Sequence, residues 1–282
     1  MNKYAERAIA FGKQQYRLWT GGMRLLPDFV IVGAQKGGTT FLYDLLVKHP
    51  FVKSAKLKEI HYFDEHFARG LWWYRSHFPL QIDRYVARQK QQTFITGEAS
   101  PYYMLHPHSL RRMADIIPHA QLIVLLRNPV DRAYSHYHHQ VRKKRETLAF
   151  EDAIAAEASR LQGELEKMLE DESYFSFNHR HFTYLERGKY IEQLQSLEQF
   201  FDKRQILILK SEDLYGNTIL SLKKVLDFLN LPEWTPKKLK ALNVGRYSNL
   251  ERETRDKLQA YFAPYNQKLY EYLGCDLGWE KQ

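Results

Sequence analysis

Short apolar, β-branched runs alternate along this chain with longer segments of helix-forming composition. The runs at residues 29–32, 93–97, 122–126 and 206–210, with a short stretch around Val52–Ser54, are typical of buried strands. Helices are predicted between and after them, at 39–48, 109–117, 129–144, 150–171, 190–201, 218–229 and 251–273. Strands that alternate with helices favour a parallel sheet covered on both faces, so the pattern predicts an α/β fold with three layers.

The domain organisation is predicted to be simple. Residues 27–282 form one domain of sufficient length for a full core, after an N-terminal helical extension at residues 1–26. Residues 146–185 carry no strand signal and lie between core elements. They are the candidate for a variable helical lid or acceptor-binding insert.

The first 20 residues carry charged side chains throughout and no apolar core. This composition predicts neither a signal peptide nor a membrane-spanning helix. We expect an amphipathic helix that lies on the domain. Contact with a membrane surface through Phe11, Tyr16, Leu18 and Trp19 is the alternative.

A glycine-rich loop follows the first predicted strand and opens the first predicted helix. Gly33, Gly37 and Gly38 permit a close backbone approach, and Thr39 and Thr40 begin the helix. Main-chain amides and the helix dipole favour an anion at such a turn. The loop differs from a nucleotide-triphosphate cradle, because Thr39 stands where that motif has lysine and the lysine is at Lys36. A phosphate-like group bound with a different geometry is therefore predicted.

A second anion site is suggested at the strand 122–126. Arg127 stands at its carboxyl end, where open α/β sheets bind ligands, and Asn128-Pro129 begins a helix. Ser135 follows eight residues after Arg127, so both side chains are able to face one anion. Taken alone, a salt bridge for Arg127 and packing for Ser135 are equally good interpretations.

Together the two segments resemble the cofactor motifs of the sulfotransferases that use 3′-phosphoadenosine-5′-phosphosulfate (PAPS). The loop at 33–40 resembles that family's 5′-phosphosulfate loop, and 127–135 resembles its 3′-phosphate site. The segment 58–64, Lys-Glu-Ile-His-Tyr-Phe-Asp, is similar to a stretch of the carbohydrate (heparan-sulfate-type) and bacterial branch. Further segments match in order, at 98–103, 187–190, 212–214, 228–232 and 245–246. The resemblance implies a P-loop-like fold with a central parallel sheet.

The resemblance also implies roles for single residues. Glu59 is the candidate general base, and its pKa would have to be raised by burial among Ile60, Tyr62 and Phe63. His61 orients the acceptor or is itself the base. The remaining implied positions are Lys36 as the leaving-group cation; Gly37, Gly38, Thr39 and Thr40 at the 5′-phosphosulfate; Arg127 and Ser135 at the 3′-phosphate; and Tyr190, Gly245 and Arg246 as further cofactor contacts. No metal is implied, and the scattered histidines lack ligand spacing.

The chain departs from the family at two positions. Ala99 stands where the heparan-type enzymes carry lysine near the acceptor, and Val244 precedes Gly245 where the family has lysine. The missing cation at Ala99 opens the acceptor to a carbohydrate, a glycolipid or a small hydroxylated metabolite. A P-loop kinase or NTPase, and a non-catalytic glycan-binding module, are the alternative functions.

Composition adds a few limits. The net charge of +9 suits a polyanionic partner, but the positive charges are scattered, and we expect no nucleic acid. The dense run Arg142 to Arg145 is interpreted first as a solvated helix face and second as a rim for an anionic acceptor. The single cysteine, Cys275, agrees with a reducing compartment, and we expect a cytoplasmic protein.

Overall fold

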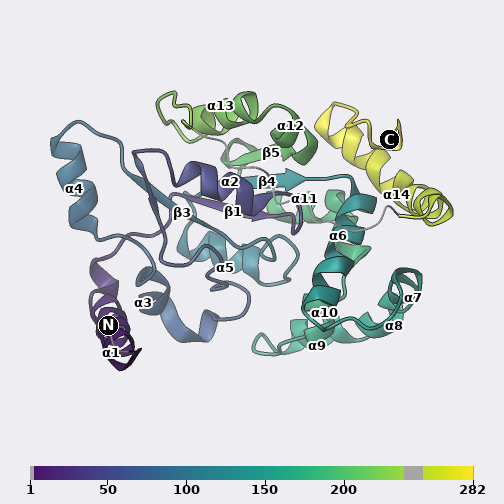
Figure 1. Cartoon of the computed structure of the whole chain (residues 1–282), viewed down its shortest axis with the longest axis horizontal. Helices are drawn as coiled ribbons and strands as arrows, with labels where there is room; N and C mark the ends of the chain where they lie inside the picture. Colours follow the sequence, from purple (N-terminus) through teal and green to yellow (C-terminus); the bar gives the residue numbers. More distant parts are fainter. Residues whose placement is uncertain (1–2, 238–249, 282) are drawn as a thin grey trace.

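The computed structural model describes residues 3–237 and 250–281. Five parallel strands form one sheet in the order β2-β3-β1-β4-β5. Figure 1 shows helices on both sides of this sheet, so the predicted three-layer α/β fold is confirmed. The strands are β1 (Phe29–Gly33), β2 (Val52–Ser54), β3 (Ile95–Ala99), β4 (Gln121–Leu126) and β5 (Ile206–Lys210).

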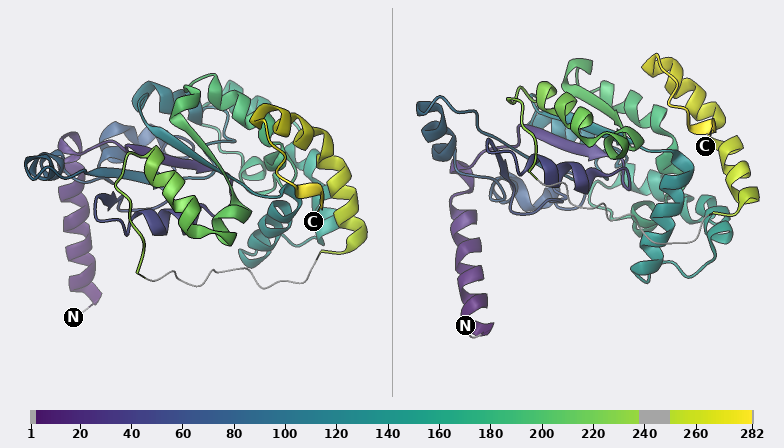
Figure 2. Two further views of the ribbon diagram at one scale, coloured as in Figure 1. Left: turned by 90° about the horizontal axis from the view of Figure 1, so that it is seen from above. Right: turned by 45° about the horizontal axis from the view of Figure 1, so that its top comes forward.

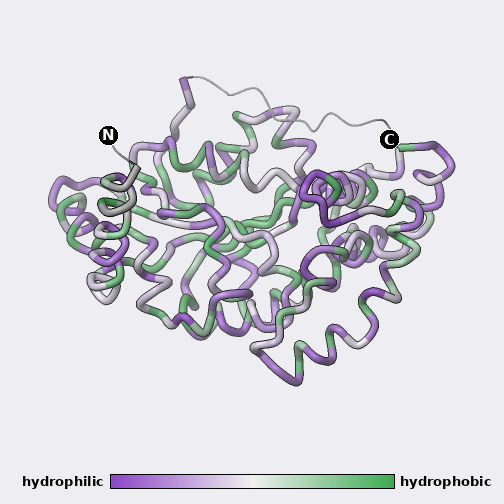
Figure 3. Tube along the Cα trace, turned by 60° about the horizontal axis from the view of Figure 1, so that its bottom comes forward, coloured by the Kyte–Doolittle hydropathy of each residue, from purple (hydrophilic) through white to green (hydrophobic). Residues whose placement is uncertain are grey.

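Successive side chains of the central strands point to opposite faces of the sheet, and helices cover both faces. Phe29 and Ile31 pack on one side with α2 (Thr39–Leu46), α12 (Ser211–Gly216) and α13 (Thr218–Phe228). Val30 and Val32 pack on the other with α5 (Ser109–Ile116), α11 (Tyr190–Glu198) and α14 (Arg252–Leu273). The trace of the outer helices alternates between hydrophilic and hydrophobic segments in Figure 3, as expected for elements covered on one side.

The strand order places three loops together at one edge of the sheet. β1 lies between β3 and β4, with Ile31 beside Ala99 and Gly33 beside Val124. The chain therefore leaves β1, β3 and β4 at neighbouring points along the carboxyl edge, where sheets of this kind bind ligands. Immediately after β4, the Asn128 side chain accepts a hydrogen bond from Val130 N (3.0 Å) and begins α6 (Pro129–Arg142).

The segment 146–185 consists of short helices. A continuous helical stretch at 150–171 was predicted, but Gly163 adopts a left-handed φ of +73° and interrupts it. The helices are α7 (Phe150–Ala155), α8 (Glu157–Leu161), α9 (Glu164–Glu170) and α10 (Phe177–His181).

Several elements were not predicted. α3 (Gly70–Arg75) is short and aromatic, and α4 (Gln81–Gln89) has exposed apolar residues with no buried side chain, so neither shows a core-facing stripe. The strand predicted at 93–97 is shifted to Ile95–Ala99. The short 3₁₀ turns are η1 (Gly21–Met23), η2 (Phe67–Arg69), η3 (Glu186–Gly188), η4 (Lys203–Gln205) and η5 (Trp279–Lys281).

The N-terminal helix α1 (Lys3–Trp19) projects from the domain, as both views in Figure 2 show. The expectation that it lies on the domain was wrong. Its last turn is attached through Arg17, whose Nε donates to Ser76 O (2.6 Å) and whose Nη2 donates to Phe78 O (3.1 Å). Phe11 and Trp19 are 65% and 84% exposed. Among the described residues, no helix is long and apolar enough to span a bilayer.

Candidate active site

The loop between β1 and α2 is held tightly against its neighbours. Ala34 N donates to Leu125 O (2.8 Å), and Ser211 Oγ donates to Gly37 O (2.6 Å). A Cβ on Gly37 would lie 2.6 Å from Leu125 O, and Gly38 has a φ of +96°. Only glycine fits these two positions without displacing main chain or adopting a strained conformation.

The loop delivers the chain to the N-terminus of α2, where Thr39 is buried and Thr40 is exposed. The first amides of a helix have no partner within it, and the helix dipole is positive there. Thr40 Oγ1 accepts a hydrogen bond from Lys58 Nζ (2.5 Å). The loop thus meets segment 58–64, the candidate catalytic segment, at a point that favours an anion.

Lys36 lies in a concentration of positive charge. Burial, followed by the charges of Arg142 and Arg127, lowers the pKa of Lys36 to about 8, while nearby Glu59 acts in the opposite direction. Lys36 itself has a left-handed φ of +70°. Cations held this close repel one another, so the arrangement fits an anionic ligand that relieves the repulsion.

Arg127 is positioned by main-chain contacts on two sides. Its Nη1 donates to Lys36 O (3.3 Å), and its own carbonyl accepts from the Tyr190 hydroxyl (2.8 Å). Tyr190 is 1% exposed, and its hydroxyl is bonded to the main chain of Arg127, so it supports Arg127 from within the core. Ser135 is buried on α6, the helix that begins directly after Arg127. The predicted contacts Gly245 and Arg246 lie outside the described residues.

The segment after β2 joins four charged side chains in a row. Lys58 Nζ lies 2.6 Å from Glu59 Oε1, and Glu59 Oε2 lies 3.3 Å from His61 Nε2. The other ring nitrogen, His61 Nδ1, lies 2.8 Å from Asp64 Oδ2. The side chain of Asp64 is fully buried, whereas 39% of the Glu59 side chain is exposed. The row therefore runs from the buried Asp64 outward to a carboxylate that solvent and ligands are able to reach.

The environment of Glu59 differs from the expected one. Ile60, Tyr62 and Phe63 turn into the core, each at most 2% exposed, while Glu59 faces the cations. Burial acts to raise the pKa of Glu59, but hydrogen bonding to His61 and the charge of Lys58 outweigh it and lower the pKa to about 2. The raised pKa that a base at this position would require is therefore not found in the structure, because the carboxylate is paired on both sides.

His61 is the central residue of this row and contacts a carboxylate through each ring nitrogen. Burial acts to lower its pKa, but hydrogen bonds with Asp64 and Glu59 outweigh it and raise the pKa to about 9. Arg180 of α10 also approaches, with Nη2 3.1 Å from His61 Nε2. A protonated Nε2 donates to Glu59, whereas an unprotonated Nε2 accepts from Arg180. The raised pKa favours the first arrangement.

The geometry places a glycine-rich anion loop, a basic cluster and a histidine-paired carboxylate at one edge of a parallel sheet. The family model for the sulfotransferase domain matches residues 26–264. The chain belongs to the sulfotransferase family. Its members use PAPS, so the predicted enzyme class is confirmed.

Named relatives extend this assignment. The sulfotransferase is 29% identical to the membrane-associated sulfotransferase kil1 of Dictyostelium discoideum, over 92% of this chain and 68% of that protein. It is 28% identical to human heparan sulfate glucosamine 3-O-sulfotransferase 3B1, over 92% of this chain and 66% of that protein. The chain thus spans about two thirds of the length of these relatives.

A solved structure gives the same result. The sulfotransferase from Alicyclobacillus acidocaldarius superposes with a TM-score of 0.68 at 27% identity, over 92% of this chain and all of that one. The resemblance to the carbohydrate and bacterial branch is therefore confirmed.

Sequence reasoning missed two charged groups of this sulfotransferase site, Asp64 and Arg180, and considered a third, Arg142, only as part of a basic run. Asp64 stands three residues after His61 within the recognised motif, a spacing that was a usable signal. Arg142 is exposed, yet its charge acts on Lys36. Arg180 comes from the insert and is joined to Glu65 by a short ion pair. Nothing near Arg180 in the sequence indicates that it reaches His61.

The atoms of His61, Asp64 and Glu65 lie close enough together to hold a cation. However, Asp64 is hydrogen-bonded to His61, and Arg180 contacts both Glu65 and His61. A guanidinium already neutralises this cluster in the sulfotransferase, which favours an ion-pair network over a metal centre.

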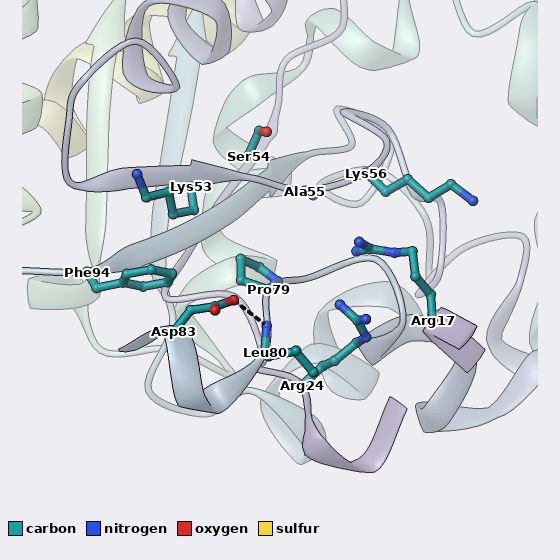
Figure 4. A pocket seen from close by; sticks show the side chains of 10 residues that line it. All are labelled: Arg17, Arg24, Lys53, Ser54, Ala55, Lys56, Pro79, Leu80, Asp83 and Phe94. Carbon is teal, nitrogen blue, oxygen red and sulfur yellow. Dashed lines mark hydrogen bonds between the residues drawn. The ribbon is translucent and has the colours of Figure 1, made fainter. Parts of the chain in front are cut away.

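Two pockets differ in their relation to the candidate site of the sulfotransferase. One of about 250 Å³ lies beside Asp64 and Glu65 and is lined by Phe67, Tyr102 and residues 172–176 of the insert. The other, of about 800 Å³, lies by the edge strand β2 and contains none of the predicted site residues (Figure 4). The smaller pocket is the one that adjoins the catalytic segment.

Proposed function

We propose that this sulfotransferase transfers the sulfuryl group of PAPS to an acceptor hydroxyl by in-line displacement. The observation that carries the proposal is that Lys58 joins the glycine-rich loop to Glu59, because its Nζ donates to Thr40 Oγ1 (2.5 Å) and lies 2.6 Å from Glu59 Oε1. Glu59 therefore lies beside the loop that carries Lys36, and the charge of Glu59 acts on Lys36. A cation for the leaving group and a carboxylate for the attacking hydroxyl are the two groups that this reaction needs close together.

The residues present fit the cofactor. Gly37 lets the loop pack directly against the main chain of Leu125, and Lys36 and Arg127 supply positive charge at the loop. Gly37, Gly38, Thr39 and Thr40 would hold the 5′-phosphosulfate, and Arg127 with Ser135 the 3′-phosphate. When bound, PAPS supplies a sulfuryl group attached to a phosphate leaving group, and no metal is required.

The chain's own residues divide the remaining work. Glu59 accepts the proton of the acceptor hydroxyl at its carboxylate, and His61 holds that carboxylate in place through Nε2. Asp64 fixes the ring of His61 through Nδ1. Lys36 stabilises charge at the leaving oxygen. An anion beside Lys36 and Lys58 draws positive charge away from Glu59, which raises its pKa and makes it a better base.

The acceptor is proposed to be a carbohydrate-type hydroxyl, on a glycan, a glycolipid or a small hydroxylated metabolite. The human relative's name specifies heparan sulfate glucosamine. In this chain the acceptor-side lysine of that branch is replaced by Ala99, which is fully buried at the end of β3. Arg180 from the insert contributes a cation beside His61 instead, and the pocket at Asp64 adjoins the same insert.

The direct test is transfer of label from ³⁵S-PAPS to a panel of heparan-type oligosaccharides, glycolipids and simple glycosides. We expect label in a carbohydrate-type acceptor and none when Glu59 is replaced by glutamine. If the protein binds 3′-phosphoadenosine-5′-phosphate (PAP), the desulfated product of PAPS, but labels no member of the panel, the proposal would be limited to cofactor binding.

We further propose a cytoplasmic enzyme that contacts an anionic membrane surface through α1. Ile9, Tyr16 and Trp19 form one stripe at helical spacing, all 48% or more exposed. Arg17 and Arg24 line the pocket at the base of the helix with Lys53 and Lys56, and the only carboxylate in that lining is Asp83 (Figure 4). Exposed aromatics beside a basic surface are typical of helices that lie in a lipid interface.

This proposal predicts binding to vesicles that contain anionic phospholipid and weaker binding to neutral vesicles. Replacing Tyr16 and Trp19 by serine is expected to weaken vesicle binding about tenfold, because two aromatic side chains no longer enter the interface. Phe200→Ser, at a partly exposed phenylalanine elsewhere, is the matched control. Co-sedimentation measures the effect. A dimer in solution that the same double variant dissociates, with no vesicle binding, would assign the stripe to a second copy instead.

A further inference from the structure

Three consecutive main-chain amides of the catalytic segment donate to side chains of one buried cluster. Ile60 N donates to Glu98 Oε2 (3.3 Å), and His61 N donates to Ser100 Oγ (3.2 Å). Tyr62 N donates to the hydroxyl of Tyr103 (2.8 Å). The acceptors lie at the end of β3 and in the turn after it. This turn therefore holds the backbone on which Glu59 and His61 are carried.

Glu98 is the centre of the cluster. Its side chain is fully buried and accepts from the hydroxyls of Ser100 (2.7 Å), Tyr74 (2.7 Å) and Tyr103 (3.2 Å). Ser100 and Tyr103 therefore each accept from an amide of the catalytic segment and donate to the same carboxyl group. Tyr74 differs, because its hydroxyl donates to Glu98, whereas its contact with the segment is made by the ring, which stacks on Tyr62.

We propose that Glu98, acting with Ser100 and Tyr103, is a positioning residue that fixes the backbone of residues 60–62 and so aims Glu59 and His61. We call the three hydrogen bonds from the amides of residues 60–62 to Glu98, Ser100 and Tyr103 the backbone clamp. Its catalytic purpose rests on the proposed function, whereas its existence does not.

The conformation of His61 gives the clamp a physical purpose. His61 has a φ of +53°, in the left-handed region that a non-glycine residue adopts only when its surroundings hold it there. Hydrogen bonds to the amides on both sides and to its own amide provide that constraint. A catalytic side chain must be held within fractions of an ångström, and bonds from a rigid strand end do this better than loop packing alone.

The protonation state of Glu98 adds a second support. Burial raises the pKa of Glu98 to about 7, against hydrogen bonds from Ser100, Tyr74 and Ile60 and the charge of His61. The other titratable groups that face it, Tyr74 and Tyr103, have pKa values raised well above the usual value and keep their protons. As the pH falls through about 7 the carboxyl gains a proton and loses an acceptor position. The clamp therefore weakens on the acid side.

Hydrogen exchange of the peptide that contains residues 60–62 tests the clamp without any enzymatic assay. Tyr103→Phe removes the acceptor of Tyr62 N and is expected to speed exchange in this peptide about tenfold. Tyr74→Phe removes a similar hydroxyl from the same carboxyl group but frees no amide, so it should leave exchange unchanged. Equal exchange in both variants would overturn the proposal.

Kinetics test the catalytic consequence. Glu98→Gln keeps the shape and, like the protonated carboxyl, one acceptor oxygen; we expect kcat to fall about tenfold with PAP affinity unchanged. In the wild type, kcat should fall as the pH drops below about 7. This fall should be absent in Glu98→Gln, because the group that titrates has been removed. Glu157→Gln is the matched control, because Glu157 is also buried, has a pKa raised to about 7 by burial, and accepts from the amides of Leu185 and Glu186.

The outcomes separate the two proposals. A fall in kcat in Glu98→Gln that Glu157→Gln matches at equal loss of melting temperature would reduce Glu98 to a structural role. If the wild-type protein does not bind PAP, the proposed function is wrong. The hydrogen-exchange experiment would still test the backbone clamp, because it does not depend on PAP.

Discussion

Replacing Glu59 by glutamine is expected to lower kcat by about 10²- to 10⁴-fold, the usual contribution of a general base. Glutamine keeps the shape of the side chain and can still accept a hydrogen bond from His61. It cannot take a proton from an acceptor hydroxyl near neutral pH. The affinity for PAP should be unchanged, because the loop at 33–40 and Arg127 are untouched. Single-turnover transfer of ³⁵S from PAPS, with calorimetric titration of PAP, measures the two quantities.

The appropriate control is Glu192→Gln, an exposed carboxylate on α11 outside the site. Normal turnover in Glu59→Gln would transfer the role of base to His61. That alternative carries its own difficulty, since a pKa of about 9 leaves His61 protonated at neutral pH and unable to accept a proton. A base at His61 would therefore require cofactor binding to lower this pKa by about two units.

Replacing Arg127 by alanine is expected to weaken PAP binding by about 2–4 kcal/mol, or about 30- to 1,000-fold. A guanidinium bound to a partly buried phosphate makes charge-assisted hydrogen bonds, and its loss leaves that phosphate unpaired. AMP lacks the 3′-phosphate, so its affinity should change little in the same variant. Calorimetric titration of both nucleotides into both proteins gives the coupling between Arg127 and the 3′-phosphate directly.

Arg204→Ala is the matched control, because the Arg204 side chain is 89% exposed and paired locally with Asp202. Arg127→Lys should recover part of the affinity but not the paired hydrogen bonds of a guanidinium. A PAP affinity in Arg127→Ala within experimental error of the wild type, or an equal loss for AMP and PAP, would place the 3′-phosphate elsewhere.

The sheet was predictable because each core strand is a local signal. Residues 29–32 and 122–126 are short, apolar and β-branched, and burial on both faces leaves no room for polar alternation. α4 was missed because its Ile82, Tyr85 and Val86 are exposed, so its apolar residues mark no core face. The N-terminal helix was recognised, but its attachment through Arg17 depends on contacts with Ser76 and Phe78, about 60 residues away, that no local pattern reveals.

The site divides in the same way. Lys36 and Arg127 follow directly from a glycine-rich loop and a strand end, and the structure brings them together. The low pKa of Glu59 could not be predicted, because three of its sequence neighbours are apolar while the groups that set its pKa are Lys58 and His61. Arg180 lies more than 100 residues from His61 in the chain. Contacts between residues so far apart in the chain are set by the fold and cannot be inferred from the spacing of residues in the sequence.

The most direct test of the central claim is a thermal-shift comparison of PAP, AMP and ATP with magnesium. At pH 7 Lys36, with a pKa of about 8, is largely protonated and able to bind a phosphate. A ligand at about 100 times its dissociation constant stabilises the folded state by about 2.7 kcal/mol, a shift of several degrees for a protein of this size. We predict a clear shift with PAP, a smaller one with AMP and none with ATP and magnesium. Stabilisation by ATP with magnesium alone would contradict the assignment of the loop and of Arg127 to a 3′-phosphorylated nucleotide.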